Sequence, residues 1–200
     1  MVFTLVCTGG IGSGKSYCAE IFQNLDIPVY VADSRTKELY LKDDVLQRKL
    51  NDLLGIDIVI DGALQKEAIA AALFCDREIL DKVNNLVHPA VLEDFYQWRE
   101  VMEKEGYDIV MLESAIYFES SVFKEVADKA IVVLSPLKIR IERIIKRDSI
   151  TEEMVISRIE KQMSDEERLA KADYRIYTDG ERAVLPQIMN ILKDIKGKRV

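Results

Sequence analysis

The sequence predicts an α/β fold in which helices cover both faces of a five-stranded parallel sheet. Short apolar runs alternate with longer helical patterns, as in parallel strands joined by helices. Three of the runs are apolar at nearly every position, as strands buried on both faces require. The chain has 200 residues, 48% of them apolar, which suffices for one domain with a substantial core. The expected strands are residues 2–7, 28–31, 109–112, 130–134 and 174–177.

Helical patterns fill the segments between these strands. About seventy residues separate the second strand from the third, and they show helical patterns at 66–74, 79–87 and 90–104 without a clear strand. We expect a helical insertion at about 37–106 that binds a substrate. The chain, residues 1–200, is then a single domain that carries this insertion.

Residues 135–163 predict two helices with a break at 148–151. Ser135 is the expected N-cap of the first helix, because a proline follows it at the first helical position. Thr151 can cap the second helix, whose first turn is acidic. Residues 164–167 have capping-box spacing, which predicts a further short helix.

The composition excludes two broad classes of partner. The formal net charge is −7, whereas a general nucleic-acid or membrane-surface binder needs a basic face. A small anionic substrate is compatible with this charge, because a few clustered basic residues can hold one. No stretch approaches the ~18 apolar residues of a membrane span, and the run at residues 2–7 is too short for a signal peptide. We expect a cytoplasmic protein, monomeric by default, that binds neither nucleic acid nor membranes.

The cysteines indicate neither disulfides nor zinc. The sequence has an odd number of cysteines, and no two of them form a C-x-x-C pair. They are Cys7, Cys18 and Cys75. Cys7 and Cys18 lie in apolar patterns, so we expect them to be buried and reduced.

A glycine-rich segment between the first strand and the first helix matches G-x-x-x-x-G-K-[ST] in Gly9, Gly14, Lys15 and Ser16. In such a loop the backbone N–H groups turn inward around phosphate oxygens, and the helix N-terminus adds positive potential. Lys15 is expected to reach the β- and γ-phosphates, and the Ser16 hydroxyl to ligate Mg²⁺. A chance glycine-rich turn is the alternative, and the strand–loop–helix setting disfavours it. The residues expected to bind ATP are Gly10, Ile11, Gly12, Ser13, Gly14, Lys15, Ser16 and Tyr17.

Two carboxylates follow strands, where groups face the ligand crevice of an open parallel sheet. Asp33 follows the second strand, where it could accept the proton of an acceptor hydroxyl or help to hold Mg²⁺. Its position fits the N-cap of a solvated helix equally well. Glu113 ends the third strand in the manner of a Walker B carboxylate and could contact the metal through water. The sequence lacks N-K-x-D, the tetrapeptide typical of guanine-reading switches.

One face of a predicted helix carries three arginines at i, i+3, i+7 spacing: Arg140, Arg143 and Arg147. Arg143 and Arg147 repel each other, and an anion between them removes this cost. Phosphoryl transfer needs mobile cations that close over the γ-phosphate, so we expect a lid at about 140–163. Arg158 and Gln162 could close from the other side. A solvated charged helix is the alternative.

Taken together, these motifs resemble the dephospho-coenzyme A kinase family over nearly the whole chain. TGGIGSGKS looks like the family's phosphate loop, and VADSRTKEL resembles its second-strand motif with the catalytic aspartate, here Asp33. VHP at 87–89 and IYFE at 116–119 are similar to family segments that face the acceptor. RIIKRD, RIEKQM and ADYRIYTDG resemble the lid and the adenine-side loop. The order and spacing of these segments carry the resemblance.

The resemblance implies a three-layer P-loop kinase core with a helical coenzyme A domain and a helical lid. It implies transfer of the γ-phosphate of ATP to the ribose 3′-hydroxyl of dephospho-CoA, with Mg²⁺. Asp33 would then accept the hydroxyl proton and, with Ser16, ligate the metal, while Lys15 holds the β- and γ-phosphates. Arg143 and Arg147 would stabilise the moving phosphoryl group. The acceptor-binding residues so implied are Lys37, His88, Tyr117, Phe118 and Glu119.

The sequence departs from the family pattern at four positions. Lys37 stands where an arginine is usual, which keeps the charge but loses the bidentate fork. Ala115 replaces a proline, and Glu113 stands where aspartate is common. Thr178 replaces an asparagine on the adenine side. His88 is the only histidine, and a structural His-Pro turn competes with a contact to the substrate.

Two other functions use the same loop. A P-loop kinase for a nucleoside or nucleotide has the same machinery with a different helical insertion. A regulatory P-loop NTPase hydrolyses its nucleotide slowly to gate a partner. The dependence of ATP consumption on the acceptor separates the three functions.

Overall fold

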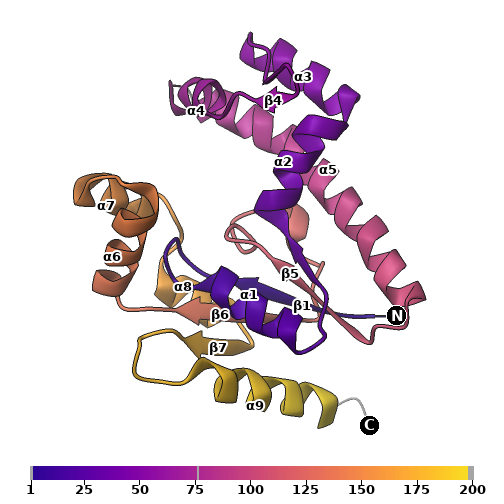
Figure 1. Ribbon diagram of the computed structural model, residues 1–200, viewed down its shortest axis with the longest axis vertical. Helices are drawn as coiled ribbons and strands as arrows, with labels where there is room; N and C mark the ends of the chain where they lie inside the picture. Colours follow the sequence, from indigo (N-terminus) through magenta and orange to yellow (C-terminus); the bar gives the residue numbers. More distant parts are fainter. Residues whose placement is uncertain (1, 76, 198–200) are drawn as a thin grey trace. The chain divides into compact units, whose positions relative to one another are not determined.

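The computed structural model describes residues 2–75 and 77–197, and it has the predicted α/β architecture (Figure 1). The chain forms two compact units, one of Met1–Tyr30 with Met102–Val200 and one of Val31–Val101. The elements of the first unit are β1 (Phe3–Thr8), α1 (Lys15–Asn24), β5 (Ile109–Glu113), the 3₁₀ turn η1 (Ser121–Phe123), β6 (Lys129–Leu134), α6 (Leu137–Asp148), α7 (Glu152–Glu160), α8 (Asp165–Lys171), β7 (Tyr174–Tyr177) and α9 (Val184–Gly197). Those of the second are α2 (Ala32–Lys42), α3 (Asp44–Leu54), β3 (Val59–Ile60), β4 (Ala63–Leu64) and α4 (Lys66–Cys75), while β2 (Val29–Val31) and α5 (Arg77–Lys104) cross the boundary.

The five-stranded sheet has the order β2-β5-β1-β6-β7, which places the first strand at its centre. β1 pairs in parallel with β5 and β6, and β6 pairs in parallel with β7. All five predicted strands are confirmed, each end within one residue of its predicted position. Since the strands are parallel, the loops after β1, β5, β6 and β7 leave the same edge of the sheet.

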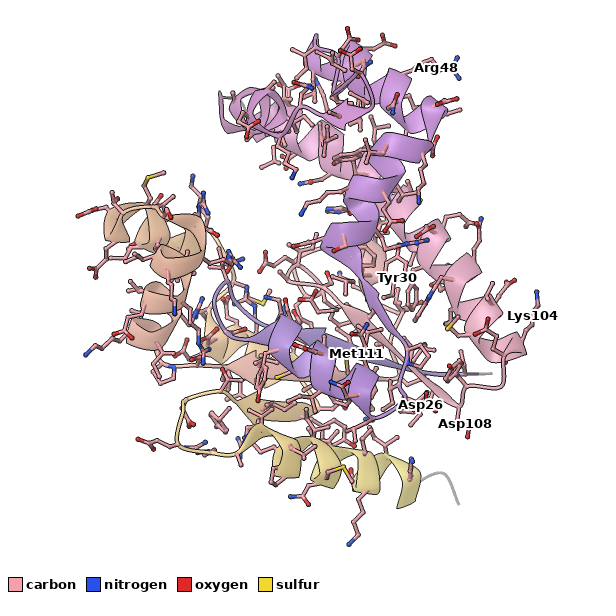
Figure 2. The ribbon with its side chains drawn as sticks, in the orientation of Figure 1. Asp26, Tyr30, Arg48, Lys104, Asp108 and Met111 are labelled. Atoms are coloured by element: carbon pink, nitrogen blue, oxygen red, sulfur yellow. The ribbon has the colours of Figure 1, made fainter. Side chains whose placement is uncertain are left out.

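One face of the sheet packs against α1 and α9 through a large apolar cluster. Cys7 of β1 and Cys18 of α1 are fully buried in this cluster with free thiols, as predicted. Met111 of β5 lies in the same cluster (Figure 2), and its backbone N–H donates to the Pro28 carbonyl at 2.8 Å. Val6, which points to the other side of β1, is also fully buried, so both faces of the sheet are covered.

The second unit contains a two-stranded antiparallel hairpin, β3 and β4, in a segment where no strand is predicted. Its turn consists of Asp61 and Gly62, with φ of 51° and 75°, the left-handed conformations that a type I′ hairpin turn requires. The expectation of an insertion without strands is therefore wrong at this point. The Asp-Gly dipeptide is the sequence signal for this hairpin.

α5 runs without interruption through Pro89, so the patterns predicted separately at 79–87 and 90–104 form one helix, and the His-Pro turn at His88 is wrong. An apolar stripe at i, i+4 spacing explains the continuous helix, because four side chains that flank the proline are buried. Each such side chain contributes roughly 1.5–3 kcal/mol by burial, which together exceeds the ~3 kcal/mol cost of an interior proline. Among the described residues, no helix, α5 included, is long and apolar enough to cross a membrane. The stripe consists of Val83, Val87, Val91 and Phe95.

α6 and α7 lie side by side in the first unit, and the predicted break between them is confirmed (Figure 1). Thr151 caps α7 as predicted, since its hydroxyl accepts from the Met154 N–H at 3.4 Å. Ser164 and the third residue of α8 form the predicted reciprocal capping box. Ser135 is not the cap of α6, because its hydroxyl donates to the Thr178 carbonyl at 3.0 Å instead.

Candidate functional site

The glycine-rich segment forms a loop between β1 and α1 at the carboxyl edge of the sheet. Gly12 and Gly14 have φ of 76° and 95°, which side chains rarely adopt. Gly10 has no such constraint, but a Cβ there would collide with the guanidinium of Arg140. The glycines therefore serve both the turn of the loop and the close approach of α6.

Three successive carbonyls of the loop accept hydrogen bonds from side chains of other segments. These contacts turn the C=O groups of residues 11–13 toward α6 and the end of β7. The N–H groups of Gly12 and Gly14 then point away from α6 and β7, because C=O and N–H of a trans peptide point in opposite directions. The Ser13 N–H instead donates to the Gly10 carbonyl at 3.1 Å. The bonds run from Arg140 Nε to Ile11 (2.9 Å), from Arg143 to Gly12 (3.2 Å) and from Thr178 Oγ1 to Ser13 (2.5 Å).

The first turn of α1 supplies further N–H groups. Gly14 is its N-cap, in a left-handed conformation and without a side-chain cap, and no acidic residue lies in the first turn. The N–H groups of Lys15, Ser16 and Tyr17 have no acceptor within the helix by geometry. The Lys15 ammonium donates to the Gly10 carbonyl at 3.3 Å. The loop and this helix end therefore have the arrangement of N–H groups and positive charge that a phosphate site requires, and the binding of phosphate there stays a prediction.

Arg143 is bound to the chain itself rather than directed at a vacant anion site. Its guanidinium donates to the carbonyl and hydroxyl of Thr178 at 2.8 and 3.0 Å, and to the Ser135 hydroxyl at 3.3 Å, besides its bond to Gly12. Arg143 thus ties the phosphate loop to the end of β7. Its predicted contact with the moving phosphoryl group stays a prediction.

Arg147 and Arg158 share one carboxylate, that of Asp148, at the junction of α6 and α7. Arg147 contacts both Asp148 oxygens, at 2.7 and 3.0 Å, and Arg158 contacts one at 3.0 Å. The hydrogen bond from Arg147 is the largest influence that lowers the pKa of Asp148. The chain itself, through Asp148, therefore supplies an anion beside Arg147.

An ionic cluster with two buried arginines lies behind the loop, and sequence reasoning missed two of its members, Asp165 and Arg168. Arg140 donates to Asp165 at 2.9 Å, and Arg168 donates to Glu119 at 2.6 Å and to Asp165 at 3.5 Å. Arg140 is 5% exposed and Arg168 is 1% exposed. Burial lowers the pKa of Arg140, the Asp165 carboxylate opposes this and Arg168 adds to it. The capping box at Ser164 predicts the helix but not which of its side chains are buried.

Glu119 and Tyr117, both predicted to bind the acceptor, have partners within the first unit. Besides its ion pair, Glu119 accepts from the Met163 N–H at 3.1 Å. Tyr117 is buried, which raises its pKa, and it lines a cavity of about 350 Å³ with Asp173, the residue before β7. Phe118 lines the same cavity, as does Ala130 near the start of β6. Phe118 is half-buried, with its ring centroid 5.0 Å from that of Tyr117.

Asp33, Lys37 and His88 belong to the second unit. Asp33 lies inside the first turn of α2 and is exposed; the N-cap is Val31, so the interpretation of Asp33 as an N-cap is wrong. Lys37 is one turn further along the same helix and is also exposed. His88 lies within α5, where burial lowers its pKa, so the imidazole is neutral at pH 7.

Glu113 is the last residue of β5 and is buried beside Cys7, its partner in the parallel register. Burial raises the pKa of the Cys7 thiol, the Cys18 thiol and the Glu113 carboxylate raise it further, and the Lys15 ammonium lowers it. A carboxylate and the loop lysine therefore both lie close enough to act on the end of β1. This is the position that a Walker B carboxylate requires, and the contact to metal through water stays a prediction.

A family model described as dephospho-CoA kinase matches residues 3–183. The chain belongs to the dephospho-CoA kinase family. It is 38% identical over 192 residues to a protein named dephospho-CoA kinase from Bacteroides fragilis, a match that covers 96% of this chain and 92% of that protein. It is 39% identical over 200 residues to one of the same name from Porphyromonas gingivalis, which covers 99% and 96% of the two chains.

Solved structures of P-loop kinases, including dephospho-CoA kinases, share the fold. TT1252 from Thermus thermophilus matches with a TM-score of 0.80 and 25% identity, over 100% of this chain and 98% of that one. Dephospho-CoA kinase from Campylobacter jejuni matches with a TM-score of 0.71 and 20% identity, over the full length of both chains. Shikimate kinase from Acinetobacter baumannii has a TM-score of 0.56 at 12% identity, over 100% of this chain and 96% of that one, and thus shares the fold alone.

Proposed function

We propose that this kinase transfers the γ-phosphate of ATP to the ribose 3′-hydroxyl of dephospho-CoA, giving coenzyme A and ADP. The observation that carries the proposal is the phosphate loop, whose carbonyls at residues 11–13 face other segments of the chain. The family model that matches residues 3–183 identifies the acceptor class. The alternatives are a nucleoside or nucleotide kinase and a regulatory NTPase, and they differ in the acceptor.

ATP binds through the loop and the start of α1 in this mechanism. The N–H groups at the start of α1 donate to the phosphates, and the Lys15 ammonium exchanges part of its contact with the Gly10 carbonyl for the β- and γ-phosphates. Tyr17, more than half exposed in the same turn, lies beside this site. Lys15 is the cation that neutralises charge on the oxygen that leaves with ADP.

Asp33 takes the proton of the acceptor hydroxyl. The hydroxyl oxygen then forms the new bond to the γ-phosphorus, the bond between that phosphorus and the β,γ-bridging oxygen breaks, and ADP leaves with the electron pair. Asp33 is exposed and is not the N-cap of α2, so no capping role competes with this one. Glu113 cannot replace it as readily, because Glu113 is buried at the end of β5.

The family implies Mg²⁺, and the donors present fit it. Kinase sites bind Mg²⁺ through one or two carboxylates together with substrate phosphates and water, so a cage of three protein carboxylates is not required. Ser16 presents an exposed hydroxyl at the start of α1, Asp33 presents an exposed carboxylate, and Glu113 at the end of β5 would act through water. When bound, the ion neutralises charge on the phosphates.

Arg147 is the lid residue that we assign to the moving phosphoryl group. Its side chain is 62% exposed, and its bond to Asp148 can be exchanged for a phosphate at little cost. Arg143 supports the reaction mainly by holding the loop through Gly12 and Thr178. It lies on α6 with Arg147, and its positive charge also acts on the moving phosphoryl group.

Acceptor binding is assigned to Lys37 and His88 of the second unit and to Phe118 of the first. Lys37 offers an exposed ammonium to a phosphate of dephospho-CoA, and the neutral His88 can donate or accept a hydrogen bond. Tyr117 and Glu119 contribute by holding the segment that carries Phe118, through the contacts described above. The reaction is assigned to a cytoplasmic monomer that uses two small-molecule substrates, ATP and dephospho-CoA.

The decisive experiment measures ADP production with dephospho-CoA, with a panel of nucleosides and nucleotides, and with no acceptor. Production that requires dephospho-CoA, with coenzyme A as the product, supports the proposal. Dependence on a nucleoside instead, or indifference to every acceptor, would overturn it in favour of one of the two alternatives. Lys15→Ala should lower the rate by several powers of ten without unfolding the protein, while Lys193→Ala, an exposed lysine of α9, serves as the matched control.

A further inference from the structure

Ile11, near the tip of the phosphate loop, is held on both of its backbone groups by the lid segment. Its N–H donates to the side-chain oxygen of Gln162 at 2.8 Å, across 151 positions of sequence. Its carbonyl accepts from Arg140 at 2.9 Å. Arg140 lies near the start of α6 and Gln162 lies just after α7, so both ends of the lid segment form hydrogen bonds with Ile11.

The N–H of Ile11 and the carbonyl of Gly10 belong to a single peptide group. This group is planar and trans, so its N–H and its C=O point in opposite directions. Because the N–H points to Gln162, the Gly10 carbonyl points the other way, where it accepts from the Lys15 ammonium at 3.3 Å. One rigid peptide therefore connects Gln162 to Lys15.

We propose that Gln162 is a positioning residue for Lys15 and acts through the Gly10–Ile11 peptide. The inference rests on the proposed function, which assigns Lys15 to the β- and γ-phosphates. Arg140 cannot replace Gln162 in this role, because Arg140 bonds to the carbonyl of Ile11 and so orients the next peptide. Without Gln162, the Gly10–Ile11 peptide keeps only the bond that the Ser13 N–H donates to its carbonyl at 3.1 Å. The peptide can then tilt about this bond, since glycine at position 10 permits many backbone angles, and its carbonyl shifts away from Lys15.

If the bond between Gln162 and the Ile11 N–H only stabilised the fold, its loss would lower stability rather than nucleotide affinity. Gln162 is half-buried, so water can satisfy the Ile11 N–H once the side chain is removed, and stability should change little. The ammonium of Lys15, by contrast, loses a fixed partner and its place beside the phosphates. Nucleotide binding should therefore suffer while the fold does not.

The test is a double-mutant cycle on the full-length protein, with Gln162→Met and Lys15→Met separately and together. We measure the dissociation constant of a non-hydrolysable ATP analogue with Mg²⁺, the thermal midpoint, and the KM for each substrate. Gln162→Asn, too short to reach Ile11, is a second variant. Gln47→Met is the matched control, because Gln47 is also half-buried and makes one side-chain bond to a backbone group, the Tyr40 carbonyl, at 2.7 Å.

Gln162→Met and Gln162→Asn should each weaken binding of the ATP analogue and raise KM for ATP by about five- to tenfold, the loss expected for one neutral hydrogen bond. The KM for the acceptor, the thermal midpoint and the Gln47→Met control should stay near wild type. In the Lys15→Met background, Gln162→Met should have no further effect on nucleotide affinity. Additive losses in the cycle, or parallel losses of stability and of both KM values, would overturn the proposal. Nucleotide binding is measured without acceptor, so a failed proposal about the acceptor would leave this test intact.

Discussion

Glu119→Ala should destabilise the protein more than Arg168→Met, although the two side chains form one ion pair. Arg168 is 1% exposed, and its 2.6 Å bond to Glu119 is much shorter than its 3.5 Å contact with Asp165. Loss of Glu119 leaves a buried guanidinium with only the long contact. Loss of Arg168 leaves carboxylates that water reaches, because the Glu119 side chain is 26% exposed. The two halves of the pair are therefore unequal.

The size of the effect follows from this geometry. Removing one partner of a buried ion pair costs roughly 3–5 kcal/mol when the other charge stays buried. The contact to Asp165 places Glu119→Ala near the lower limit, about 3 kcal/mol, which for a chain of this length lowers the thermal midpoint by roughly 6–12 °C. Arg168→Met fills the same space with apolar atoms, so we expect a loss of about 1 kcal/mol.

Thermal unfolding of the two single variants and the double variant tests this order. The double variant should be more stable than Glu119→Ala alone, because it removes the unpaired guanidinium. Lys42→Met is the control, since it breaks an exposed i, i+4 pair with Glu38 and should cost less than about 0.5 kcal/mol. A Glu119→Ala protein with a normal midpoint and a tenfold higher KM for dephospho-CoA would refute the reasoning and restore Glu119 to the acceptor site.

Three further predictions concern the reacting groups. Asp33→Asn should lower kcat by about 10²- to 10⁴-fold with little change in ATP affinity, and a near-normal kcat would remove Asp33 as the base. Thr178→Val removes a buried hydroxyl that bonds both Ser13 and Arg143, so ATP affinity should fall at least tenfold, while Thr178→Ser should stay near wild type. Arg147→Ala should lower kcat much more than nucleotide affinity. Hydrogen exchange in α6 and α7 should slow when an ATP analogue and acceptor bind together; unchanged exchange with normal kcat would contradict the lid.

The strands and the phosphate loop could be predicted because their signals are local. A short run that is apolar at four successive positions, as β5 is before Glu113, favours a strand covered on both faces. The loop pattern between β1 and α1 requires no distant neighbour to be recognised. The hairpin at Asp61 also had a local signal, but its strands of two residues each are too short for a periodicity. Pro89 suggested a turn where the structure has a continuous helix, because packing along α5 outweighs the local preference of one residue.

The side-chain contacts of the site could not be predicted in the same way. That Arg168 is among the most buried side chains depends on Glu119 and Asp165, which reach it from two segments. The spacing of the arginines on α6 correctly places them along one helix, but it cannot distinguish a ligand anion from a backbone carbonyl or a neighbouring carboxylate. Asp148 therefore went unnoticed as the partner of Arg147.

The three arginines of α6 differ in how readily each can exchange its partner for a phosphate. Arg140 is 5% exposed and bonded to Asp165 and the loop, so its removal leaves a loop carbonyl without its donor and Asp165 with only the 3.5 Å contact to Arg168. Arg143, half-buried, holds Gly12 and Thr178 by neutral acceptors, which would also be left without a donor. Arg147 has an exposed side chain and can exchange the Asp148 carboxylate, which keeps its bond to Arg158, for another anion at little cost. The stability lost on truncation to alanine should therefore decrease from Arg140 to Arg147, and only Arg147→Ala should lower kcat without lowering the thermal midpoint. The same spacing on one helix thus gives two arginines that shape the loop and one that is able to move.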